Sequence, residues 1–143
     1  MTQVDFYIIP ENQPRSKDVV TCRLTEKALK QGFRVLILGQ DQKQLQALDE
    51  KLWTYKEQSF IPHEIEPENA ITSEHCHVVL SENSNAYTVA NLLINLSGKI
   101  PEGYARFERI AEIVPGKQQD RQQSRVRYKQ YREQSCTLNT HEL

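Results

Sequence analysis

The six residues Phe33-Arg34-Val35-Leu36-Ile37-Leu38 decide the fold, because they form a short apolar run rich in branched side chains. Such a run, closed here by Gly39, is typical of a strand buried on both faces of a parallel sheet. Gly32 precedes it, where a helix end favours a residue that tolerates positive φ, and Asp41 follows it as the N-cap of a second helix. Helix, strand and helix in this order predict βαβ units and an α/β sheet.

Patterns elsewhere in the chain extend this arrangement. Apolar runs predict four more strands, at residues 4–9, 77–80, 91–96 and 107–114. Helical spacing predicts three helices, one between Ser16 and Gly32, one from Asp41 to about Trp53 and one over 118–133. Residues 54–75 are expected to be ordered but irregular. Residues 1–143 are therefore predicted to form one Rossmann-like α/β domain, with a mostly parallel five-stranded sheet flanked by helices.

Composition excludes several classes of protein. A hydrophobic content of 38% and a charged content of 26% are typical of a soluble globular domain. No apolar run approaches the roughly 20 residues of a membrane-spanning helix, and the first residues lack a secretory signal, so a cytoplasmic location is expected. The net charge of −1 argues against general attraction to nucleic acid or membrane. The three cysteines are far apart, which favours reduced thiols.

Motifs for catalysis or for cofactor binding are absent from the sequence. Neither of the glycine-rich loops that cradle phosphates occurs, and no nucleophile elbow is present. His75 and His77 would share one face of a strand around Cys76, which raises a metal hypothesis, but ordinary polar residues are the favoured interpretation because two ligands do not close a zinc site. The sequence predicts no catalytic site, no cofactor and no metal. A small α/β enzyme with a degenerate nucleotide site is an alternative suggested by the fold alone.

Basic residues gather in the last predicted helix. Residues 117–132 contain one acid, Asp120, and six basic residues, which are Lys117, Arg121, Arg125, Arg127, Lys129 and Arg132. The apolar content of residues 124–132 is only Val126 and two tyrosines, so much of the helix is expected to remain exposed.

One face of this helix combines cations with an aromatic ring. Positions at i, i+4, i+7 and i+11 carry Arg121, Arg125, Tyr128 and Arg132, and Lys129 lies beside them. Such a face can hold an acidic peptide through charge-assisted hydrogen bonds while the ring packs an apolar side chain. A solvated charged face and direct binding of nucleic acid are the alternatives, and the balanced total charge argues against the second.

A second candidate surface joins Trp53, at the end of the second predicted helix, with Phe60 and Pro62. A lone tryptophan usually belongs to the core. An exposed cluster of this composition would instead be a hot spot for binding another protein.

Several stretches together resemble one known family, the chi subunits of bacterial DNA polymerase III holoenzyme, which are accessory proteins of its clamp-loader assembly. The joint occurrence of L-D-x-x-L-W, S-F-x-P-H and R-Y-K-x-Y-R is specific. The stretches that carry the resemblance are Phe6-Tyr7-Ile8-Ile9, Gly32-Phe33-Arg34-Val35-Leu36-Ile37, Asp41-Gln42-Lys43-Gln44, Leu48-Asp49-Glu50-Lys51-Leu52-Trp53, Ser59-Phe60-Ile61-Pro62-His63, Glu112-Ile113-Val114-Pro115, Arg127-Tyr128-Lys129-Gln130-Tyr131-Arg132 and Leu138-Asn139-Thr140.

The resemblance implies a non-catalytic connector in DNA replication that contacts DNA mainly indirectly. One side would bind the psi subunit of DNA polymerase III, through a surface with Trp53, Phe60 and Pro62, and a repair helicase is a further partner implied for that surface. The other side would bind the acidic, phenylalanine-ended tail of single-stranded-DNA-binding protein. The residues implied for the tail site are Val114, Arg121, Arg125, Tyr128, Lys129 and Thr140.

Overall fold

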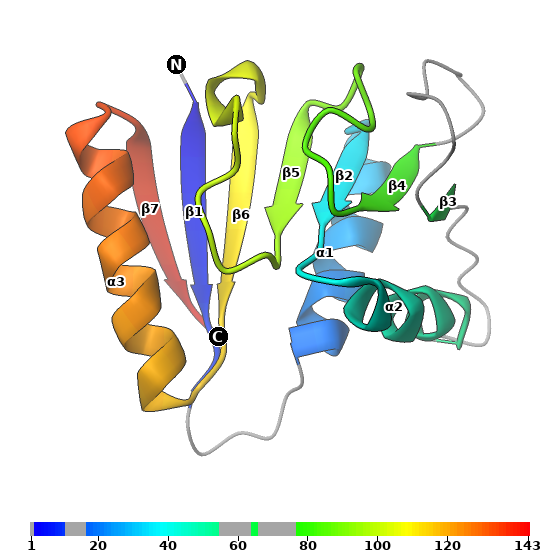
Figure 1. Ribbon diagram of the computed structural model, residues 1–143, viewed down its shortest axis with the longest axis horizontal. Helices are drawn as coiled ribbons and strands as arrows, with labels where there is room; N and C mark the ends of the chain where they lie inside the picture. The colour runs from blue at the N-terminus through cyan, green and yellow to red at the C-terminus, as the bar shows by residue number, and fades with distance from the viewer. Residues whose placement is uncertain (1, 11–16, 55–63, 66–76) are drawn as a thin grey trace.

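The structure, a computed structural model, describes residues 2–10, 17–54, 64–65 and 77–143 (Figure 1). The helices are α1 (Lys17–Lys30), α2 (Gln42–Thr54) and α3 (Gln118–Glu133), with one 3-10 turn, η1 (Tyr104–Arg106). The strands are β1 (Gln3–Ile8), β2 (Val35–Leu38), β3 (Glu64–Ile65), β4 (Val78–Ser81), β5 (Leu92–Asn95), β6 (Arg109–Val114) and β7 (Thr137–Glu142).

The strands form one sheet in the order β3-β4-β2-β5-β6-β1-β7, and every neighbouring pair is parallel. The predicted α/β class with a parallel sheet is confirmed. The predicted number of five strands is wrong, because the described sheet also contains β7 and the two-residue β3. Residues 137–142 contain only one apolar residue, so an edge strand open to solvent gives little hydrophobic pattern to recognise.

The predicted strand at the centre of the sheet is buried on both faces, as its sequence indicates. Val35 and Ile37 join an apolar cluster with residues of α1 and α2, whereas Leu36 and Leu38 join a second cluster on the other face. The second cluster includes Tyr131 of α3 and side chains from the segments around β5 and η1. Two helices therefore pack on one face, and α3 packs on the other near β6 and β7.

Both predicted signals that flank β2 are confirmed. Gly32 ends α1 with φ of +84°, and the next amide, of Phe33, donates to the Ala28 carbonyl at 3.0 Å. Asp41 caps α2, since its carboxylate accepts a hydrogen bond of 2.8 Å from the Gln44 amide. No helix among the described residues is long and apolar enough to cross a bilayer.

Predictions for residues outside the described ranges are not tested by the structure. They concern the helix cap at Ser16, the apolar segment with Phe60 and Pro62, and the metal hypothesis at His75 and Cys76. Within the described part of the chain, no cluster of three or more potential ligands that could hold a metal ion is found.

Gly39 allows α2 to pack closely behind the end of β2. A Cβ atom at this position would lie 2.5 Å from Cδ2 and 2.8 Å from Cγ of Leu45, a side chain that is fully buried. The glycine therefore serves packing between the strand and the helix, because any side chain would overlap the core.

We expect Gly39→Ala to lower the free energy of unfolding by about 1–3 kcal/mol, since the new methyl group would force the fully buried Leu45 side chain to shift. Denaturant unfolding measures this loss. The exposed neighbour provides the control, because Gln40→Ala is expected to change stability by less than about 0.5 kcal/mol. Equal losses in the two variants would contradict the packing role of Gly39.

Candidate functional site

The orientation of α3 on the sheet determines which of its residues form a site. Ser124, Arg127 and Tyr131 are buried and form the stripe that faces the sheet. Arg121, Arg125, Tyr128 and Arg132 form a neighbouring stripe, roughly a quarter turn around the helix. We call this second stripe the cationic flank of α3.

A buried polar network holds α3 in this orientation. The Glu112 side chain in β6 is 1% exposed, and its Oε1 accepts a hydrogen bond of 3.1 Å from Arg127 Nε. Its Oε2 accepts hydrogen bonds from Asn95 Nδ2 at 2.7 Å and from the Tyr131 hydroxyl at 2.8 Å. Arg127 also donates to the Gly98 carbonyl at 3.1 Å. The network thus joins α3 to β5, β6 and the turn between them.

The charges in this network balance one another. Burial raises the pKa of the Glu112 carboxyl, and the Arg127 charge and the hydrogen bonds from Asn95 and Tyr131 oppose that shift. Burial and the nearby Glu112 raise the pKa of the Tyr131 hydroxyl, so this group stays protonated and donates.

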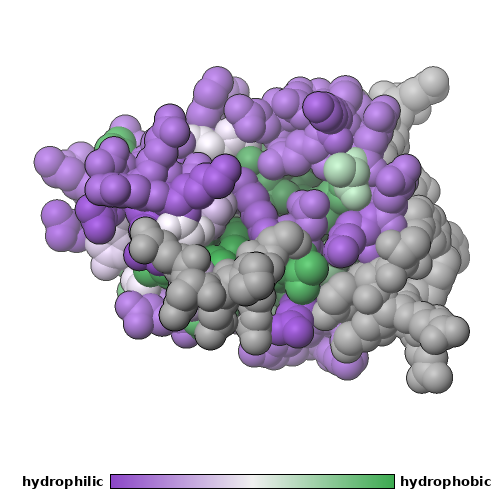
Figure 2. Space-filling view, turned by 90° about the horizontal axis from the view of Figure 1, so that it is seen from below, coloured by the Kyte–Doolittle hydropathy of each residue, from purple (hydrophilic) through white to green (hydrophobic). Residues whose placement is uncertain are grey.

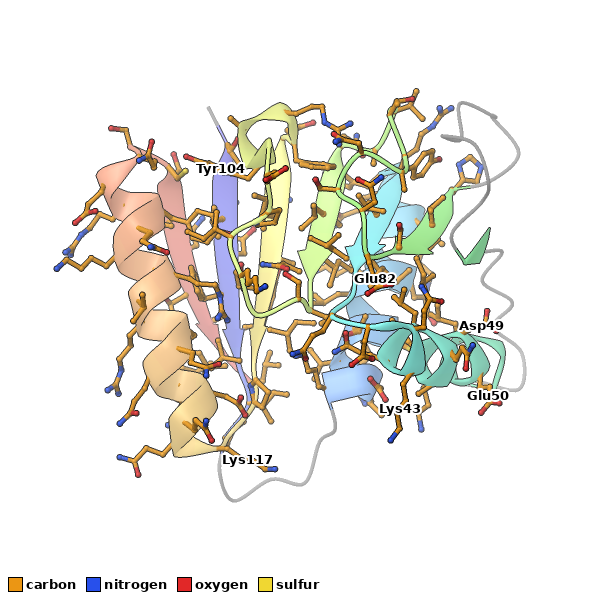
Figure 3. All side chains as sticks on the ribbon, in the orientation of Figure 1. Lys43, Asp49, Glu50, Glu82, Tyr104 and Lys117 are labelled. Carbon is orange, nitrogen blue, oxygen red and sulfur yellow. The ribbon has the colours of Figure 1, made fainter. Side chains whose placement is uncertain are left out.

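The Tyr131 ring is also packed against an aromatic neighbour. Tyr104, labelled in Figure 3, packs edge-on against Tyr131 with ring centroids 5.6 Å apart.

Arg127 therefore differs from the other cations of the basic run. It is buried and neutralised, so it belongs to the core and not to the surface that the sequence composition suggests. Val126, which the sequence offers as apolar mass for packing, is instead 59% exposed. Both positions follow from the orientation of α3. Arg127 faces the sheet and pairs with Glu112, whereas Val126 points away from the sheet into solvent.

The cationic flank borders the carboxyl-end half of β1. Arg121 donates from Nη2 to the Ile9 carbonyl at 3.2 Å, and the Tyr128 ring packs on the Phe6 ring at a centroid distance of 5.2 Å. Val114 pairs in register with Ile8. Val114 and Tyr128 belong to one apolar cluster, and Ile9, which Arg121 contacts, bonds through its amide to the Val114 carbonyl. Val114, Tyr128 and Arg121 therefore lie near one another, and their role in binding a tail stays a prediction.

Thr140 lies on the same side of the sheet. It pairs in register with Phe6 across the parallel β1–β7 ladder, so the two side chains share the face that α3 covers. Leu138, two residues earlier, packs against the same cluster as Phe6. We call the strip of surface between the cationic flank and β7 the groove. The apolar side chains beneath it, which we call its floor, are Phe6 and Val114, which are buried, and Tyr128, which is partly exposed.

Three cations on this groove are available to a partner. Arg125, Lys129 and Arg132 are exposed, and none of them makes an ion pair with another described residue. Arg121 Nε is buried and has no hydrogen-bond partner among the described residues. A buried donor without a partner costs free energy, so Arg121 Nε is an unsatisfied group beside the groove.

The space-filling view from the carboxyl ends of the strands shows hydrophilic residues over α3 and apolar residues exposed near the middle of the face (Figure 2). Lys117 projects from the lower end of α3 at this edge (Figure 3). Lys17, at the start of α1, adds a further cation that the sequence did not indicate. Burial lowers the pKa of Lys17, and the charge of Asp120 in α3 opposes this shift.

Sequence reasoning named Val114 and Tyr128 but missed Phe6, the third residue of the floor. Phe6 and Ile8 alternate with Asp5 and Tyr7 along β1, and this alternation separates the face that α3 covers from the opposite face. The pattern is visible in the sequence, but it does not say which helix covers which face.

The helix that carries Trp53, the first residue of the second predicted surface, lies toward the other edge of the sheet. Trp53 is in the last turn of α2, a helix that contacts β3 and β4. The side chain of Trp53 and the residues Phe60 and Pro62 lie outside the described part, so their arrangement remains a prediction.

Two cavities lined by described residues lie away from the groove. One, of about 490 Å³, is on the face opposite α3 and includes Asp5, which His141 contacts at 3.3 Å. The other, of about 550 Å³, lies at the carboxyl ends of β2, β4 and β5, where nucleotides bind in many α/β folds. Among the described residues, its lining includes Glu82 and Glu102 but a single cation, Lys99, which suits a phosphate poorly.

Comparison with known proteins identifies one family. The family model described as "DNA polymerase III chi subunit, HolC" matches residues 1–139. The chain is similar to the DNA polymerase III subunit chi of Pseudomonas aeruginosa, with 38% identity over 143 residues that cover 100% of this chain and 98% of the relative.

Two further relatives carry the same description. The subunit chi of Haemophilus influenzae is 31% identical over 135 residues, which cover 94% of this chain and 93% of the relative. The subunit chi of Escherichia coli is 26% identical, with 98% of this chain and 97% of the relative covered.

The two kinds of arginine in α3 should differ in their effect on stability. We expect Arg127→Met to lower the free energy of unfolding by about 3–5 kcal/mol, because it leaves the Glu112 carboxylate buried without its ion-pair partner. Arg125→Met is the matched control on the exposed flank and is expected to cost less than about 0.5 kcal/mol. Denaturant unfolding distinguishes them.

A double variant tests the cause of that loss. If the unpaired carboxylate is responsible, Glu112→Gln should cost much less free energy in the Arg127→Met background than in the wild-type protein. Additive losses would argue against coupling between the two side chains.

Proposed function

The chain belongs to the family of DNA polymerase III chi subunits, and we propose that it links the psi subunit to the acidic tail of single-stranded-DNA-binding protein. Members of this family are non-catalytic accessory subunits of the polymerase, so partners within that assembly follow from membership. The identities of the two partners and the residues that bind them are our proposal.

The unneutralised cationic flank beside an apolar floor supports tail binding. A tail that ends in phenylalanine presents a carboxylate, an aromatic ring and preceding acidic side chains. Arg121 and Arg125 supply donors for the carboxylate, Val114 and Tyr128 supply apolar contacts, and Lys129 extends the positive charge along the helix. Thr140 closes the groove from β7.

The separation of the two surfaces supports a connector. The end of α2 packs near β3 and β4, whereas α3 packs near β6 and β7, at the other end of the sheet (Figure 1). Five strand spacings separate β4 from β7, which is about 24 Å. Two protein partners of ordinary interface size can therefore bind at once without touching each other.

Weak binding at the groove is compatible with this role. The contact is small and exposed, so we expect a dissociation constant in the micromolar range that rises steeply with salt. Tethering to a polymerase assembly and to a partner with several tails raises the effective concentration without any new contact.

Direct binding of nucleic acid is the second candidate function. It is favoured by the same exposed residues, Arg125, Lys129 and Arg132. The aromatic ring on this flank, Tyr128, is packed against Phe6 and is therefore a poor stacking platform for bases. Tight binding of a bare oligonucleotide with a steep salt dependence would favour this alternative over tail binding.

Tail binding is tested with Arg125→Ala and a synthetic acidic peptide that ends in phenylalanine. We expect affinity to fall at least about tenfold, because a charge-assisted hydrogen bond contributes roughly 1.5–3 kcal/mol. Calorimetry at low and moderate salt measures the change, and unfolding curves should stay as in the wild-type protein. Gln123→Ala, which is exposed on another side of α3, is the control. Unchanged binding by Arg125→Ala would refute the proposed site.

Psi binding is tested with Trp53→Ala. We expect the free energy of binding to purified psi to weaken by about 2 kcal/mol or more, as for an aromatic hot spot. The melting temperature of the variant should change little. The exposed residue Gln46, also in α2, provides the control variant Gln46→Ala. A large fall in melting temperature would instead indicate that Trp53 is a core residue.

A further inference from the structure

The outer edge of β7 is an open edge of the sheet. Five of its six residues are exposed, and no other described strand pairs with that side of β7. Residues 137–142 contain neither proline nor lysine. Proteins usually blunt such an edge, because its main-chain groups can pair with another extended chain.

The register shows which main-chain groups point outward. The Thr137 amide donates to the Thr2 carbonyl at 3.2 Å, and the Leu143 amide donates to the Ile8 carbonyl at 3.0 Å. In a parallel ladder alternate residues bond to the same neighbour, so the odd-numbered residues of β7 bond to β1. The amide and carbonyl groups of Leu138, Thr140 and Glu142 therefore point to the open edge.

The cationic flank of α3 runs beside this edge and matches it in length. From Arg121 to Arg132 the helix rises about 16 Å, and β7 extends about 16 Å from its first to its last residue. The helix connects the parallel strands β6 and β7 and so runs antiparallel to both. Arg121 lies at the carboxyl end of the sheet, and Arg132 lies near the start of β7 (Figure 1).

We propose that an acidic, extended peptide adds to the outer edge of β7 as a further parallel strand, held by the main chain of Leu138, Thr140 and Glu142 and flanked by the cations of α3. The inference rests on the proposed tail-binding function and gives its binding mode. The direction is set by charge, because a terminal carboxylate placed at Arg121 and Arg125 lies at the carboxyl end of β7. The preceding acidic residues then pass Lys129 and Arg132.

This mode explains how a groove with few deep contacts can hold a peptide. Main-chain hydrogen bonds give affinity that does not depend on the peptide sequence, while the alternate side chains that face α3 carry the specificity for acidic residues.

The test uses Thr140→Pro in the full chain. The Thr140 amide points outward, so proline removes a donor to the peptide and no bond to β1, and an edge strand tolerates proline at such a position. Asn139→Val is the control, because the Asn139 side chain lies on the opposite face of the sheet. We expect the acidic peptide that ends in phenylalanine to bind Thr140→Pro about tenfold more weakly and Asn139→Val as the wild type. Equal affinities of the two variants would overturn the inference.

A second measurement uses the wild-type protein, so it does not depend on the folding of a variant. The same peptide is synthesised with an N-methyl group at one position after another. Added-strand binding predicts that methylation weakens affinity at every second position and leaves the intervening positions unaffected. Tolerance at all positions, or equal loss at all, would overturn the β7 mode. Failure of the unmodified peptide to bind would instead refute the proposed function.

Discussion

The buried ion pair between Glu112 and Arg127 is the interaction on which the functional surface depends. Burying two charges costs several kcal/mol, and the cost is offset only when geometry and further hydrogen bonds are good. Here both carboxylate oxygens have partners, with Asn95 and Tyr131 completing the set. Because these bonds join α3 to β5 and β6 at fixed positions, α3 has one orientation about its axis. Its neighbouring stripe must then face β1 and β7.

Two arginines of the same helix, Arg127 and Arg125, thus have opposite roles. Arg127 is neutralised inside the domain and specifies structure, whereas Arg125 lies outside without an ion-pair partner among the described residues and remains free to bind. The difference is set by a rotation of about 200° between the two positions on the helix. A buried charge pair is weak support for stability in general, but in this domain it determines which charges reach the surface.

The parallel sheet separates the two proposed partner surfaces, and its edge strand β7 borders the proposed tail-binding surface. Its order puts α2 near one edge and α3 near the other, so one sheet connects the two helices. Parallel sheets are usually covered on both faces, and β7 departs from this rule with a polar, exposed sequence at the edge. The same strand that completes the fold therefore borders the groove and offers unpaired main-chain groups.

Much of this molecule could be read from the sequence because the relevant signals are local. Residues 35–38 are apolar without interruption, so a strand buried on both faces is the only regular element that suits them, and Gly32 and Asp41 mark its flanking helices. Helical spacing alone placed Arg121, Arg125 and Tyr128 on one stripe. Resemblance to the chi family added Val114 and Thr140, which no spacing connects to α3.

The tertiary structure decided which side of each element faces inward and what lies beside it. Nothing local distinguishes Arg127 from Arg125, and only the distant carboxylate of Glu112 makes one of them a core residue. Likewise residues 137–142 form a strand because β1 offers them a ladder, although their own hydrophobic pattern is weak. The sequence by itself determined the elements and their stripes, since propensity and periodicity act over a few residues. Burial and pairing join residues more than a hundred positions apart, so only the folded chain could bring the cations, the aromatic floor and the open edge together.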